Sequence, residues 1–164
     1  MIKKILVPIA FSKYSKGIIK FANDLAVPLG AELLIANVVN ERDIEAVERI
    51  ASFGYKVDSD QYIATIQKER VAELELILAE LKIAEERYNF VFQAGDPTME
   101  LLRLVIKHNV DLVVMGTRAK DIKHIFTGSV AEKMFRKCPI SIIFHRDGDV
   151  AKDLDKRVRK ELKH

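Results

Sequence analysis

Short, uninterrupted apolar runs recur along the chain, and the segments between them carry apolar residues at helical spacing. The runs cover residues 5–8, 33–39, 90–92, 112–115 and 140–144. Strands that are apolar on both faces are typical of a parallel sheet that helices cover on both sides. Five such strands alternating with helices predict an α/β fold with a doubly wound parallel sheet.

The first half of the chain holds two expected helices and one ambiguous segment. Apolar residues follow helical spacing from Ile18 onward, and Gly30 is placed to end that helix. Residues 60–86 predict one long helix, about 40 Å at 1.5 Å per residue, which is longer than the sheet requires. Residues 41–58 suggest a short helix with a break at Gly54.

The second half predicts three more helices. Asp96 followed by Pro97 is typical of an N-cap and a first helical residue. Residues 129–137 form the next expected helix. The charged tail after Arg146 predicts a narrow amphipathic helix, whose apolar stripe is Val150, Leu154, Val158 and Leu162. Such a short helix is marginal alone in water, so it either docks on a neighbouring subunit or on the long helix, or remains a frayed, solvated tail.

Composition favours one globular domain in a reducing compartment. The chain has 164 residues, and Cys138 is its single cysteine, which excludes an intrachain disulfide. We therefore expect a cytoplasmic location, and no apolar run approaches a membrane span. With 27 basic and 24 acidic residues, the net charge of +3 calls for neither a nucleic-acid nor a membrane partner.

Two glycines after the fourth predicted strand indicate an anion-binding loop. Gly116 follows the strand directly, and Gly128-Ser129 opens the next helix, so backbone N–H groups could face a phosphate there. A second interpretation needs no ligand, because Ser129 and Glu132 have capping-box spacing. The chain lacks the Gly-Lys-Ser/Thr of a P-loop.

Five segments together resemble the universal stress protein family: residues 4–8, 95–97, 111–117, 128–133 and 138–143. The resemblance extends over about residues 1–146, in the right order. It implies a Rossmann-like sheet of the adenine nucleotide alpha hydrolase type, with five parallel strands in the order 3-2-1-4-5. It also implies a homodimer joined along the last strand, residues 140–144. The resemblance leaves residues 147–164 as a charged, helical C-terminal extension.

Many members of that family bind ATP, and this sequence departs from their signature. The acidic residue expected two positions after Pro8 is Ala10, the second glycine of the loop is Ala119, and only the eight residues 120–127 precede Gly128. The hydroxyl residue often found three positions after that glycine is Ala131. A lost charge-assisted hydrogen bond costs about 1.5–3 kcal/mol, so these departures predict a degraded ATP site.

Positions that match the family motif give the candidate nucleotide- or anion-binding residues. They are Pro8, Ile9, Ala10, Val38, Met115, Gly116, Arg118, Gly128, Ser129 and Val130. We expect no cofactor, although weak ATP or AMP binding, or another anion, stays open. We expect no catalytic residue and no metal ligand either, because the four histidines show no metal-ligand spacing.

Three functions compete on these observations. The resemblance favours a non-catalytic stress-response module that acts as a dimer, with an unidentified protein partner. An ATP- or AMP-binding sensor of the same fold is the alternative. A nucleotide-dependent α/β enzyme is disfavoured, because the sequence offers neither the carboxylate at position 10 nor a nucleophile–base pair.

Overall fold

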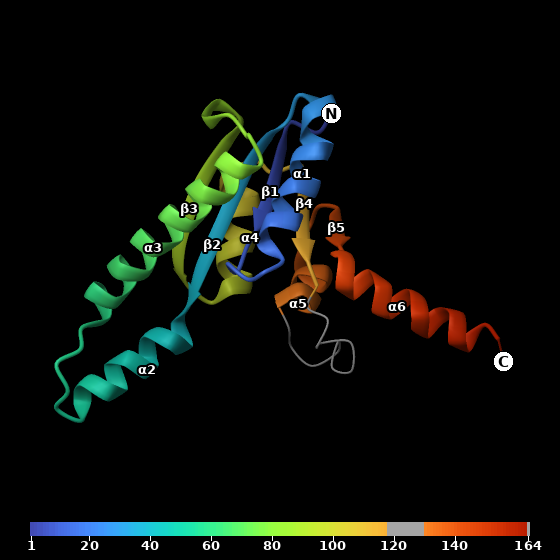
Figure 1. The fold of residues 1–164 in the computed structure, drawn as a ribbon. Helices are drawn as coiled ribbons and strands as arrows, with labels where there is room; N and C mark the ends of the chain where they lie inside the picture. The colour runs from blue at the N-terminus through green and yellow to red at the C-terminus, as the bar shows by residue number, and fades with distance from the viewer. Residues whose placement is uncertain (118–129, 164) are drawn as a thin grey trace.

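The computed structural model contains one five-stranded parallel sheet, and it describes residues 1–117 and 130–163. The strand order is β3-β2-β1-β4-β5, which confirms the predicted order 3-2-1-4-5. Figure 1 shows the sheet between layers of helices. The strands are β1 (Lys4–Pro8), β2 (Glu32–Asn40), β3 (Tyr88–Gly95), β4 (Leu112–Gly116) and β5 (Ile142–His145).

Helices fill the connections between the strands. They are α1 (Ser15–Leu29), α2 (Glu41–Ser52), α3 (Ser59–Glu80), the short 3-10 helix η1 (Glu85–Arg87), α4 (Pro97–Lys107), α5 (Val130–Lys137) and α6 (Gly148–Glu161). Asp96 caps α4 as predicted, because its Oδ1 accepts a hydrogen bond from the Met99 N–H at 2.9 Å. Gly30 ends α1 in the left-handed conformation, with a φ of 61°.

Alternate residues of the central strand β1 feed two separate cores. Ile5 and Val7 pack with α1 and the C-terminal part of α3, whereas Leu6 packs on the other face with α4 and α5. All three side chains have 0% exposure. Burial on both faces explains why the strand reads as a continuous apolar run rather than an alternating one.

The long helix predicted over residues 60–86 is shorter in the structure, because α3 ends at Glu80. Lys82 has a φ of 54°, and the Ile83 N–H donates to the Leu78 carbonyl at 3.0 Å. This turn carries the Ile83 side chain into the core, where it is 8% exposed. The residues after Glu80 favour a helix by their intrinsic propensity. The helix nevertheless ends there, because the turn allows Ile83 to be buried.

The helices α2 and α3 form a hairpin that extends past the end of the sheet (Figure 1). Only Leu74 and Leu78 of α3 are buried, and both lie in its C-terminal half. The ambiguous segment 41–58 is thus α2 followed by a loop. The hairpin brings the N-terminal half of α3 above the carboxyl ends of the strands.

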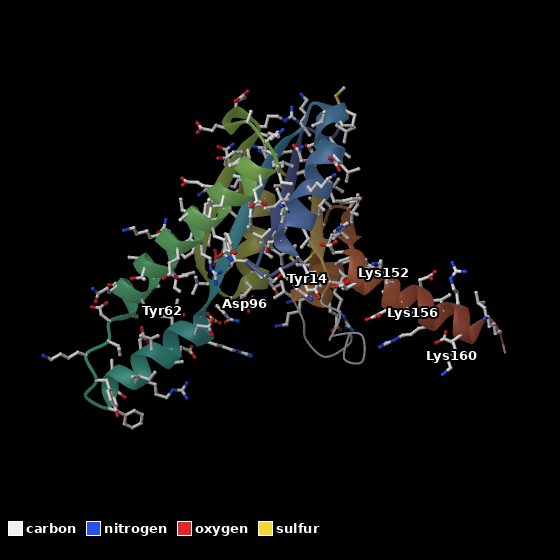
Figure 2. The ribbon with its side chains drawn as sticks, in the orientation of Figure 1. Tyr14, Tyr62, Asp96, Lys152, Lys156 and Lys160 are labelled. Carbon is white, nitrogen blue, oxygen red and sulfur yellow. The ribbon has the colours of Figure 1, made fainter. Side chains whose placement is uncertain are left out.

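The tail forms a helix, α6, that docks only at its start. Val150 is fully buried, and Asp147 caps the helix by accepting from the Gly148 N–H at 2.7 Å. Val158 and Leu162 are 50% and 81% exposed. Figure 1 shows α6 leaving the body on the side away from α3, and Figure 2 shows three lysines along it. The expected docking on the long helix is therefore wrong, and a neighbouring subunit remains a prediction.

Truncation after Arg146 is expected to lower the free energy of unfolding by about 1–3 kcal/mol, because burial of a valine side chain contributes this much. The buried residue that is lost is Val150. Truncation after Arg157 is the matched control, because the described residues that it removes, 158–163, are exposed, and Val150 is kept. Urea denaturation of both proteins measures the difference, and equal midpoints would contradict the docking of α6.

Asp111 ties the start of β4 to the start of β1. Its Oδ2 accepts hydrogen bonds from the backbone N–H groups of Lys3 and Lys4, at 2.8 and 3.0 Å. These two donors lower the pKa of the Asp111 carboxyl below its ordinary value. A lowered folded-state pKa stabilises the protein above the unfolded-state pKa, and this contribution disappears as the pH falls through the folded-state pKa.

We therefore expect Asp111→Asn to lower the melting temperature at pH 7. The difference from the unsubstituted protein should shrink as the pH falls below about 4, where the carboxyl gains its proton. Melting curves at several pH values measure this difference. A difference that does not change with pH would mean that the carboxylate charge at Asp111 contributes nothing.

Candidate functional site

A cavity of about 690 Å³ lies at the carboxyl ends of β1, β2 and β4. Ligands of open parallel sheets bind at this edge, where the strand order reverses, and the volume is within the range of small-molecule sites. The cavity walls come from the turn after β1, the end of β2, the end of β4, the start of α5 and the N-terminal half of α3.

Seven of the ten predicted site residues line this one cavity. They are Pro8, Ile9, Ala10, Val38, Met115, Gly116 and Val130. The other three, Arg118, Gly128 and Ser129, lie outside the described residues. The structure thus brings together residues from three strands and one helix. That they bind a ligand remains a prediction.

The turn after β1 is held by hydrogen bonds from β2. The Ile9 N–H donates to the Ala36 carbonyl at 2.8 Å, and the buried Asn37 donates from Nδ2 to the Ile9 carbonyl at 2.8 Å. Phe11, in the left-handed region with a φ of 53°, packs edge-on against Phe90. These contacts fix the position of Ala10 at the cavity.

Gly116 and Thr117 form the cavity edge where β4 ends. A Cβ at Gly116 would lie 2.5 Å from Ile18 Cδ1, so this close approach favours glycine. The Thr117 Oγ1 is buried and has no hydrogen-bond partner in the described part of the chain. A buried hydroxyl without a partner is costly, and a ligand in the adjoining cavity could supply one.

Sequence reasoning missed the wall of the cavity that the α2–α3 hairpin supplies. Tyr62, Ile66 and Arg70 follow one another at four-residue spacing on α3, and Asp43 comes from the first turn of α2. Figure 2 shows Tyr62 on the hairpin, with Asp96 and Tyr14 to its right. The four-residue spacing is visible in the sequence, but nothing in it indicates which face of α3 turns toward the sheet.

Few charged side chains line the cavity in the described part of the chain. Asp43 and Arg70 are the two ionisable acidic or basic side chains among its described lining residues. Within the described ranges, no three His, Cys, Asp or Glu side chains are grouped to hold a metal ion. Likewise, no helix in residues 1–117 or 130–163 has the length and apolar character to cross a membrane.

The sequence profile of the universal stress protein family matches residues 1–146 of this chain. The chain belongs to the universal stress protein family. A relative in that family is universal stress protein MJ0577 of Methanocaldococcus jannaschii, which is 25% identical over 146 residues, covering 84% of this chain and 90% of the relative. The solved structure of MJ0577 superposes with a TM-score of 0.68 at 24% identity, covering 90% of this chain and 99% of that chain.

Two further solved universal stress proteins share the fold and hold adenine nucleotides. One, in complex with cAMP, has a TM-score of 0.64 at 18% identity, covering 88% of this chain and 97% of its own. The other, from Archaeoglobus fulgidus in complex with dAMP, has a TM-score of 0.59 at 13% identity, covering 89% and 98%. At these identities the likeness establishes the common fold.

Proposed function

We propose that this universal stress protein is a non-catalytic, cytoplasmic regulatory module whose ATP site is weakened. The observation that carries the proposal is Ala10, which lines the cavity where the family's ATP-binding members place an acidic residue. A methyl group accepts no hydrogen bond from an adenine amine or a ribose hydroxyl. The loss of one charge-assisted hydrogen bond weakens binding by roughly 10- to 100-fold.

Nucleotide sensing is the second candidate, and it rests on the retained cavity. A volume of about 690 Å³ and a buried Thr117 hydroxyl that has no hydrogen-bond partner among the described residues are both features of a ligand site. The related structures with cAMP and dAMP add support. Mass spectrometry of the purified protein separates the candidates, because a sensor that binds ATP or AMP tightly should retain the nucleotide through purification.

Millimolar ATP is expected to raise the melting temperature of this protein little. Ligand stabilisation equals RT ln(1 + [L]/Kd), so a micromolar site would add about 4 kcal/mol at a thousandfold excess of ligand. Thermal melts with and without ATP measure the shift. A rise of several degrees, or ATP retained in the purified protein, would overturn the weakened-site proposal.

The matched variant for this melt is Ala10→Asp combined with Ala119→Gly. These substitutions restore the acidic residue and the second loop glycine of the family signature. We expect the double variant to gain a larger ATP-dependent shift than the unsubstituted chain. Equal shifts would mean that these two positions do not limit binding.

We further propose that the protein acts as a homodimer paired through β5, with a protein partner as its target. The support is the position of β5 at an edge of the sheet, where backbone groups lack a described neighbouring strand on one side.

A further inference from the structure

A cation lies beside the turn that carries Ala10, the position at which the family signature has an acidic residue. Arg70 of α3 lines the same cavity as Ala10, and its Cζ lies 4.8 Å from the centre of the Phe11 ring. Phe11 is the residue directly after Ala10. The turn after β1 and the α3 wall therefore meet at this guanidinium.

Arg70 keeps most of its hydrogen-bonding capacity for a ligand. A guanidinium has five N–H donors and no acceptor. Within the described part of the chain, its Nη1 lies 3.5 Å from the carboxylate of Glu73, whose side chain is 47% exposed. Such a long, exposed contact between residues three apart on a helix holds the side chain weakly. Stacking on Phe11 supplies the second restraint on its position.

Purine bases differ in the hydrogen-bond acceptors that they present to a group with several N–H donors. Adenine presents an amino donor beside the N7 acceptor, whereas a 6-oxopurine presents two adjacent acceptors, O6 and N7. An arginine fork donates to both acceptors of a 6-oxopurine, and it leaves the adenine amine without a partner. An acidic residue at position 10 would have the opposite preference where its carboxylate accepts from the amine rather than from a ribose hydroxyl.

We propose that Arg70 sets the ligand specificity of the cavity, and that the ligand is a 6-oxopurine nucleotide rather than an adenine nucleotide. The proposal deepens the proposed function, because it rests on a cavity that has been retained while the acidic group that the family's ATP-binding members present to the nucleoside is absent. Gly116 and Thr117 at the end of β4 remain available to the rest of the nucleotide. The base lies at the wall that Tyr62 and Arg70 share.

Asp43 is the group that could reverse this preference. Its carboxylate also lines the cavity, and it is an acceptor for an amine. Asp43 belongs to the first turn of α2, where the helix N-terminus already favours its negative charge. If the Asp43 carboxylate accepted a hydrogen bond from the adenine amine, AMP would bind better than IMP, and Asp43→Leu, which has no acceptor, would abolish that advantage.

Calorimetric titration with IMP and AMP tests the proposal, because these probes differ only at the C6–N1 edge of the base: IMP has an oxo group beside an N1–H donor, and AMP has an amino group beside an N1 acceptor. We expect the full chain to bind IMP about tenfold more tightly than AMP, the size of one good bidentate contact. Arg70→Met should remove this preference while its side chain still covers Phe11. Arg70→Lys keeps the charge without the fork, and should retain only part of the preference.

Arg103→Met is the matched control. Arg103 also pairs with a glutamate three residues away, Glu100, but it is outside the cavity lining. This variant should keep the full preference for IMP. Circular dichroism and melting curves of each variant show that the fold is intact, so a lost preference reports on recognition.

Three results would overturn the proposal. The first is equal or tighter binding of AMP by the unsubstituted chain, and the second is an unchanged IMP preference in Arg70→Met. The third is no binding of either nucleotide at millimolar concentration, which leaves the weakened ATP site standing and removes only the 6-oxopurine ligand. Tight ATP binding would instead overturn the proposed function, whatever the ratio of IMP to AMP affinity.

Discussion

Replacing Leu6 by alanine is expected to lower the free energy of unfolding by about 2–5 kcal/mol, the range for large-to-small substitutions in a packed core. Leu6 has 0% exposure and belongs to β1, the central strand. It pairs in register with Leu34 of β2 and Val113 of β4, and it faces α4 and α5. The surrounding strands restrict collapse around the space that the leucine vacates.

Leu76→Ala on α3 is the matched control, because it deletes the same atoms from a side chain that is 68% exposed. This variant should change the free energy of unfolding by less than about 0.5 kcal/mol. Denaturant titrations of both variants give the comparison. Similar destabilisation by the two substitutions would contradict the placement of Leu6 in the core.

The strands could be predicted because burial on both faces requires a continuous run of apolar residues in the sequence. Residues 5–8 and 112–115 are continuous apolar runs, and they become β1 and β4 within one residue at either end. No such local pattern in the sequence indicates the order of the strands in the sheet. An apolar run shows that a strand is covered, but not which strand lies beside it. The order came from the resemblance to a family.

The end of α3 and the α3 wall of the cavity could not be predicted, because both depend on contacts distant in sequence. Ile83 is buried in a core that also contains Ile5, so a long-range contact ends the helix after Glu80. Arg70 lines the cavity because the hairpin lies over the strand ends. In the sequence, Arg70 is one of many charged residues on a helix.

The part of the site that follows β1 could be predicted, because its position depends on residues that are close together in the sequence. Pro8 and Ala10 are placed by the end of a single strand, and the doubly wound sheet has its ligand site at that edge. Residues directly after a strand therefore carry a signal that residues on an overlying helix lack. The same reasoning singled out Gly116 at the end of β4, which lines the same cavity.

A homodimer paired through β5 is expected to depend on backbone groups that face away from β4. The Val113 N–H donates to the Ser141 carbonyl at 3.0 Å, and Val113 is in register with Ile142. Hydrogen-bonding directions alternate along a strand in a parallel pair, so the N–H of Ile142 points to the open edge. Strand pairing between two subunits would use this N–H.

Ile142→Pro is therefore expected to convert the dimer to a monomer, because proline removes the outward N–H and spares the hydrogen bonds to β4. Ile142→Val is the matched control, since it keeps the N–H and deletes one methylene group. Light scattering at about 100 μM measures the mass, because a standard-sized interface usually binds well below that concentration. A monomeric unsubstituted chain, or a dimeric Ile142→Pro variant with an intact melting transition, would refute pairing through β5.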